Sequence, residues 1–123
     1  MEKPNMIKDK SYQFALEVTR LYKALQVQNE YVLSRQLVKA GTSIGANVEE
    51  ATTAQNGKDF YSKMAIASKE AREAKYWLRV LQDSKTYEKI DFSGTLKKSE
   101  ELINILAAII KKGQQKNKST ANK

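Results

Sequence analysis

The sequence contains no cysteine and no histidine, and it has one proline and five glycines among 123 residues. Without cysteine the chain forms neither disulfides nor thiolate metal sites, which is compatible with a reducing cytoplasm. Without histidine it lacks the commonest general base and metal ligand, so His-dependent catalytic triads and zinc motifs are excluded. The scarcity of proline and glycine favours helices, as does the abundance of Ala, Leu, Lys, Glu and Gln.

Long apolar segments are also missing. The longest uninterrupted apolar run is ILAAII, residues 105–110, whereas a membrane span needs about 20 apolar residues. The N-terminus, MEKPNMIKDK, has no apolar signal segment. We therefore expect a soluble, cytoplasmic protein of one domain with no membrane partner.

Apolar residues recur at the spacing of amphipathic helices in four segments. We expect helices at about 8–27, 30–55, 59–84 and 91–112. The third has the clearest pattern, a 4-3-4-3-4-3 seam made of Phe60, Met64, Ala67, Ala71, Ala74, Leu78 and Leu81. Four such helices with short connections predict an all-α fold, an antiparallel up-down-up-down four-helix bundle over residues 1–113.

Polar residues and glycines mark the expected helix ends. Asn29 is the expected N-cap of the second helix, and Gly57 is expected to supply a left-handed residue at that helix's end. Asp59 suits the unpaired amides at the start of the third helix. Gly113 is expected to close the fourth helix.

Positive charge is concentrated at the C-terminus. The formal net charge is +8, and residues 111–123 hold five lysines and no acid, which leaves +3 for the rest of the chain. One interpretation is that residues 114–123 form a solvated, disordered tail. The other is a weak polyanion-binding arm, with contacts from Lys111, Lys112, Lys116 and Lys118.

The stretch TSIGANVEEA interrupts the apolar pattern of the second helix. Ser43, Asn47 and Glu50 form a polar line about 100° around from the apolar stripe. Gly41 and Gly45 each cost about 1 kcal/mol relative to alanine inside a helix. We expect another helix to approach closely there, with Asn47 and Glu50 forming hydrogen bonds across the contact. The alternative is that the polar line faces water, and the pattern favours neither.

The segments SRQLVKAGTSIGANVEEA and KDFYSKMAIASKEAREAKYWLRVL resemble the four-helix-bundle family named for 23S rRNA intervening sequences. The family's motif is Ser-Ile-x-Ala-Asn-aliphatic-x-Glu. This chain matches it at Ser43, Ile44, Ala46, Asn47, Val48 and Glu50. Many members have proline in place of Gly45 and glycine in place of Ala51. The resemblance spans roughly residues 10–110 and is specific over 34–81.

The resemblance implies an antiparallel four-helix bundle that assembles into a ring-shaped homo-oligomer, a pentamer. The family is related to the accessory protein of diversity-generating retroelements, which works with a reverse transcriptase and binds nucleic acid. For most members, including those encoded within rRNA intervening sequences, the resemblance implies no defined activity.

The third helix carries more apolar surface than one seam requires. Four residues lie beside the main stripe: Ile66, Tyr76, Trp77 and Val80. Because tryptophan is enriched at interface centres, these residues form the expected oligomer interface. The alternative is that they widen the core contact with neighbouring helices.

Basic residues form a stripe on the opposite flank of the third helix, at Arg72, Lys75 and Arg79. On the second helix, Arg35 and Lys39 lie away from the apolar side. Such runs are commonly solvated faces. Repeated around a ring, however, they would sum to a positive field that binds phosphate backbones with little sequence preference.

Three classes of function compete. The leading one is a non-enzymatic homo-oligomeric accessory factor that binds RNA or DNA, with a reverse transcriptase as a partner if the gene lies in a retroelement. The alternative is a protein–protein adaptor or scaffold with no nucleic-acid role. An enzyme has almost no support, because the sequence has no phosphate-binding glycine loop and no Glu-x-x-His motif of a di-iron bundle. We expect no catalytic residues, no cofactor and no metal.

Overall fold

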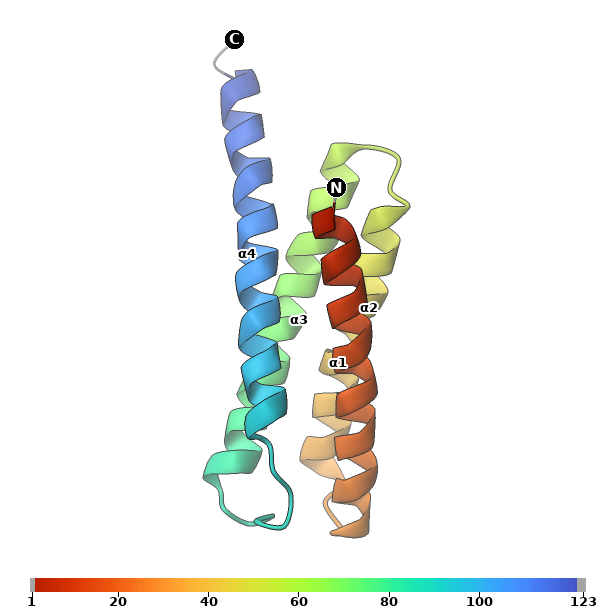
Figure 1. The fold of residues 1–123 in the computed structure, drawn as a ribbon, viewed down its shortest axis with the longest axis vertical. Helices are drawn as coiled ribbons and strands as arrows, with labels where there is room; N and C mark the ends of the chain where they lie inside the picture. The colour runs from red at the N-terminus through yellow and green to blue at the C-terminus, as the bar shows by residue number, and fades with distance from the viewer. Residues whose placement is uncertain (1, 122–123) are drawn as a thin grey trace.

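The computed structural model describes residues 2–121, with side chains described for residues 6–116. The chain forms four helices: α1 (Glu2–Val27), α2 (Val32–Thr52), α3 (Gly57–Asp83) and α4 (Ser93–Ala121). Consecutive helices run antiparallel (Figure 1). Each helix packs against two others in the cyclic order α1, α2, α3, α4, and within the described residues no close backbone contact joins α1 to α3. The predicted all-α four-helix bundle is confirmed, with α1 and α3 on one diagonal.

The apolar stripes of the four helices meet in one core. The predicted seam of α3 is buried except for Phe60, which packs against the edge of the core. The other helices contribute large buried side chains to the same core: Phe14, Leu25, Leu37, Ile44, Leu102 and Leu106. Small residues in α3 let neighbouring axes come close, while the larger side chains opposite supply the buried apolar area.

α1 packs tightly against α2 at the two glycines of α2. A Cβ atom on Gly41 would lie 2.7 Å from Cγ2 of Val18, and one on Gly45 would lie 3.4 Å from the carbonyl oxygen of Ser11. Both glycines are buried. The expected crossing helix is therefore confirmed, and it is α1.

Polar contacts join α1 to α4. Glu17 Oε1 accepts a hydrogen bond from the Thr95 hydroxyl at 2.9 Å, and Lys98 forms an ion pair with the same carboxylate. A second ion pair also joins α1 to α4, in which Lys10 Nζ lies 3.0 Å from Glu101 Oε2. These contacts fix the register of the helix pair that has the smallest backbone contact in the bundle.

The turn between α1 and α2 is capped by Glu30 rather than by Asn29. The Glu30 carboxylate accepts hydrogen bonds from the backbone amides of Val32 at 3.0 Å, Leu33 at 2.8 Å and Ser34 at 2.5 Å. Amides in the first turn of a helix have no partner within the helix, and a negative charge is favourable there. Asn29 instead has a φ of 64° and turns the chain after α1. The prediction of Asn29 as the N-cap was wrong because the longer carboxylate side chain reaches three amides.

Gly57 starts α3 and does not end α2. No glycine has a positive φ, and α2 has already ended at Thr52. The side-chain oxygen of Asn56 accepts a hydrogen bond from the Asp59 amide at 2.9 Å. Asparagine is among the strongest N-cap residues, so the local sequence here favours a helix start.

The outer ends of α1 and α4 extend beyond the predicted bounds. α1 begins at Glu2 because Pro4 is tolerated in the first helical turn. α4 passes through Gly113 and continues to Ala121, projecting beyond the other helices (Figure 1). A Cβ on Gly113 would lie 2.6 Å from a ring carbon of Tyr61, so this glycine is a helix–helix contact.

Residues 114–121 were predicted to belong to a disordered tail, but they are helical in the structure. The physical reason is that no proline follows Gly113, and glutamine, lysine and alanine are good helix formers. Residues 122 and 123 lie outside the described residues.

Candidate nucleic-acid interface

The basic stripe of α3 lies on the flank that faces α4. Lys75 Nζ is 3.4 Å from Glu100 Oε2 on α4, which fixes the direction of this flank. Arg72 and Arg79 are exposed on either side of that pair, and neither forms an ion pair with any described residue. An incoming phosphate can therefore contact two unpaired guanidinium groups, but it has to compete with Glu100 for the lysine.

Arg35 and Lys39 belong to a different surface. Both are exposed on α2, which lies on the diagonal opposite α4. The structure therefore does not bring them together with the α3 stripe, and one straight nucleic-acid segment cannot contact both sets on a single copy of the chain.

The C-terminal lysines lie on the projecting end of α4. Lys111, Lys112 and Lys116 are exposed, and Lys118 is in the helix, although its side chain lies outside the part of the chain described in detail. Lys111 and Lys112 are consecutive and so point about 100° apart.

The polar line of α2 does not form the predicted set of hydrogen bonds between helices. Asn47 Nδ2 donates to the Ser43 carbonyl at 2.8 Å, and the Ser43 hydroxyl donates to the Lys39 carbonyl at 2.7 Å, all within α2. Glu50 does reach α3, through an exposed ion pair with Lys63 at 2.7 Å. The prediction was thus wrong for Asn47, because its short amide side chain bonds within its own helix. For Glu50 the contact between helices exists in the form of a solvated ion pair.

The apolar members of the same motif have separate roles. Ile44 and Val48 are fully buried core residues, whereas Ala46 faces outward. The motif therefore combines a core contact with a polar line on the side of α2 that faces α3.

The predicted interface residues on α3 are only partly covered. Ile66 is 40% exposed and Tyr76 is 52% exposed. Trp77 is half-buried and packs against the core, which supports the alternative that it widens the core contact. Its indole Nε1 donates to Glu73 at 3.3 Å, and its ring meets Tyr76 edge-on at 5.0 Å between centroids.

A second group of exposed apolar residues lies on α1 and was not predicted. Tyr12 is 57% exposed and Val27 is 80% exposed, with Leu16 half-buried between them. The sequence signal for them is weak, because on this face of α1 the charged Arg20 and Lys23 separate Val27 from the pair Tyr12 and Leu16.

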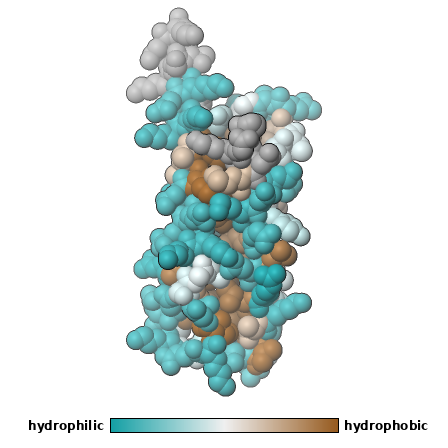
Figure 2. Space-filling model, viewed as in Figure 1, coloured by the Kyte–Doolittle hydropathy of each residue, from teal (hydrophilic) through white to brown (hydrophobic). Residues whose placement is uncertain are grey.

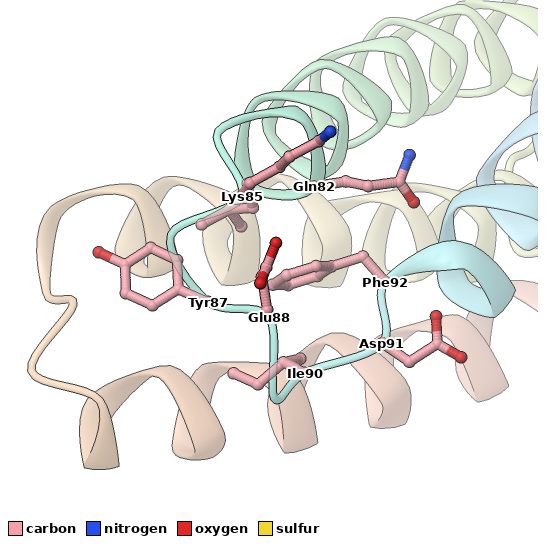
Figure 3. Close-up of a pocket in the computed structure, with 8 residues that line it drawn as sticks. Gln82, Lys85, Tyr87, Glu88, Ile90, Asp91 and Phe92 are labelled. Atoms are coloured by element: carbon pink, nitrogen blue, oxygen red, sulfur yellow. The ribbon is translucent and has the colours of Figure 1, made fainter.

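A pocket of about 410 Å³ lies at the α3–α4 connection (Figure 3), between Leu81, Gln82, Lys85, Tyr87, Glu88, Ile90, Asp91 and Phe92. Asp91 Oδ1 accepts hydrogen bonds from the Ser93 hydroxyl at 2.7 Å and from the Ser93 amide at 3.0 Å, and these lower the pKa of Asp91. A lowered pKa keeps the carboxylate charged, whereas a general acid near neutral pH needs a raised pKa. Elsewhere in the described part of the chain, no three carboxylates gather where they could hold a metal ion.

None of the helices within residues 2–121 is both long enough and apolar enough to cross a membrane. The face formed by α1 and α4 is mostly hydrophilic, with apolar side chains showing in separate patches (Figure 2).

Comparison with known proteins identifies relatives. The family model for the 23S rRNA-intervening sequence protein matches residues 3–108. A solved structure of a protein with unknown function from the S23 ribosomal protein family, from Bacteroides thetaiotaomicron, is 43% identical. Its TM-score is 0.81, and the match covers 89% of this chain and 98% of that one. No curated protein matches the sequence.

The match to the family model covers most of the chain and includes the motif in α2. The four-helix architecture agrees with that of the Bacteroides protein. This chain is a member of the 23S rRNA-intervening sequence protein family.

Proposed function

We propose that the protein is a non-enzymatic homo-oligomer of the cytoplasm that binds the phosphate backbone of RNA or DNA with little sequence preference. The observation that carries this proposal is the pair of unpaired, exposed arginines, Arg72 and Arg79, on one flank of a rigid helix.

The geometry of the stripe suits a phosphate backbone. Arg79 lies seven positions after Arg72, which is about 10 Å along a helix axis at a rise of 1.5 Å per residue. A nucleic-acid strand carries one charge per roughly 3.4 Å of duplex axis, so the stripe spans about three phosphates. Because the helix already fixes the backbone at both arginines, binding costs mainly the rotamer entropy of the two side chains.

Assembly would strengthen this binding. A single stripe supplies only a few contacts, and Glu100 offsets part of its charge. Copies arranged in a ring would repeat the stripe and sum its field. We propose a pentamer, with a reverse transcriptase as the protein partner where the gene lies in a retroelement.

The test is fluorescence anisotropy with a labelled 30-mer RNA across a salt series. The logarithm of the affinity should fall with the logarithm of the salt concentration, with a slope of about −0.7 per phosphate contacted. Arg72→Glu/Arg79→Glu should weaken binding by at least about tenfold and reduce the slope by roughly two contacts.

A matched control is Lys58→Glu/Lys89→Glu, which changes the net charge equally at exposed positions away from the stripe. Its affinity should stay within about threefold of the parent chain, since only long-range charge is altered. If the parent chain shows no binding at low salt, the proposal is wrong. The exposed Ile66 and Tyr76 then make the adaptor the better interpretation.

A further inference from the structure

The outward faces of α1 and α3 carry two stripes of matching spacing. We define the α1 outer stripe as Leu16, Arg20, Lys23 and Val27, and the α3 outer stripe as Ile66, Glu70, Glu73 and Trp77. Both stripes follow a 4-3-4 spacing, so each keeps to one side of its helix. Along the chain, one reads apolar, basic, basic, apolar and the other reads apolar, acidic, acidic, apolar.

Among the described residues, the charged members of the two stripes have no partner on another helix of the bundle. α1 and α3 lie on one diagonal, so their outer faces point in opposite directions. Arg20, Lys23 and Glu70 form no ion pair with the described residues, and Glu73 is bonded only within its own helix, to the Trp77 indole.

The apolar ends of the stripes are also incompletely covered. Val27 is 80% exposed and Ile66 is 40% exposed. Leu16 is half-buried but does not pack against the core. Trp77 packs against the core but is only partly buried.

We infer that the α1 outer stripe of one copy of the chain binds the α3 outer stripe of the next copy, with the two helices parallel. The contacts are Leu16 with Ile66, Arg20 with Glu70, Lys23 with Glu73, and Val27 with Trp77. The inference rests on the homo-oligomer in the proposed function and identifies the surfaces that form it. A second copy is the occupant because the chain itself supplies the complementary charges in the same order and spacing.

The arrangement has a consequence for the shape of the assembly. A contact between opposite faces is heterologous, so each copy retains one free stripe until the series closes into a ring. The basic flank with Arg72 and Arg79 lies on the other side of α3 from the acidic stripe and stays uncovered.

Charge reversal tests the pairing by sedimentation equilibrium. Arg20→Glu/Lys23→Glu and Glu70→Lys/Glu73→Lys should each dissociate the assembly to the 14.0 kDa chain, because like charges then face each other. The variant with all four substitutions has reversed but complementary stripes and should assemble again. Lys58→Glu/Lys89→Glu serves as the control for net charge and should assemble normally.

Cysteine cross-linking tests the direction of the pairing. The chain has no cysteine of its own, so Leu16→Cys/Ile66→Cys introduces one defined pair. These positions lie on opposite faces of one copy, so a disulfide, which needs Cα atoms within about 7 Å, can form only between copies. Oxidation should give covalent multimers, whereas Val27→Cys/Ile66→Cys, which would pair only in antiparallel helices, should give far fewer.

The outcomes separate this inference from the proposed function. An oligomeric parent chain whose mass is unchanged by both double reversals would overturn the stripe pairing and leave the oligomer in place. Preferential cross-linking of the antiparallel pair would overturn the parallel direction. A parent chain that sediments as a monomer would overturn both the assembly and the pairing, and RNA binding is measured independently of either.

Discussion

Two glycines in α2 lie where α1 packs tightly against it, and their packing outweighs their poor helix propensity. Gly41→Ala should gain about 1 kcal/mol in propensity. The new methyl group, however, would lie 2.7 Å from a γ-carbon of the fully buried Val18, and valine has little rotamer freedom in a helix. Overpacking of this kind costs about 1–3 kcal/mol.

The overpacking cost less the propensity gain leaves a net loss, so we expect Gly41→Ala to lower the free energy of unfolding by up to about 2 kcal/mol, as measured by urea denaturation. The control is Gly94→Ala, whose Cβ would meet no neighbouring atom within 4 Å. It should be neutral or slightly stabilising. Equal stabilisation by both substitutions would show that α1 can move away from α2 at no cost.

Asp91 makes part of the stability depend on pH. The hydrogen bonds from Ser93 lower the pKa of Asp91 in the folded chain. Its contribution is therefore fully present above the unfolded pKa of about 3.8 and is lost as the pH falls through the folded pKa. Asp91→Asn should be less stable than the parent chain at pH 7, and the difference should shrink by pH 3.

The comparison for Asp91 is Asp9→Asn, whose exposed carboxylate accepts no hydrogen bond from any described residue. Urea denaturation at both pH values measures the two variants. If the Asp91→Asn difference were independent of pH, the Ser93 contacts would not act through the charged carboxylate.

At the scale of an element, the start of α2 depends on one side chain. Glu30→Ala leaves three amides of the first turn without their carboxylate acceptor. N-cap losses cost about 0.5–2 kcal/mol, and we expect the upper part of that range because the acceptor is charged. Chemical denaturation measures the loss, and the exposed neighbour Gln28→Ala should change stability by no more than about 0.5 kcal/mol.

The projecting end of α4 should be dispensable for the fold. Gly113 is in contact with Tyr61, and the described residues beyond it, Gln114 to Lys116, are exposed. Deleting residues 114–123 should weaken RNA binding but leave the melting temperature within a few degrees of that of the parent chain. Deleting residues 106–123 should destabilise the bundle strongly, because it removes the fully buried Leu106. A large loss in the shorter deletion would show that this helical end packs on another copy.

At the scale of the whole molecule, the assembly is the main prediction. Sedimentation equilibrium at micromolar concentration should give the mass of five copies of the 14.0 kDa chain. The physical reason is that head-to-tail joining covers both outer stripes of a copy, and closure into a ring leaves no stripe free at the ends of the series. A mass that keeps rising with concentration would show an open filament, and a single chain would show that the stripes stay solvated.

Much of the fold could be predicted from the sequence, because helix formation and core burial follow a local period. The spacing of apolar residues in each segment predicted four helices and the buried seam of α3, and both are confirmed. The glycines of α2 predicted a close helix crossing. The basic flank of α3 was predicted as a stripe, and Lys75 shows that the flank faces α4.

Other features depend on which residues far apart in the chain meet, and only the tertiary structure decided them. Gly113 resembles a helix end by itself, but Tyr61 packs against it and the helix continues. Arg35 and Arg72 are both exposed basic residues, but the diagonal arrangement of α2 and α4 places them on separate surfaces. Periodicity fixes the angle of a side chain around its own helix axis, whereas its neighbours depend on how four helices pack around one core.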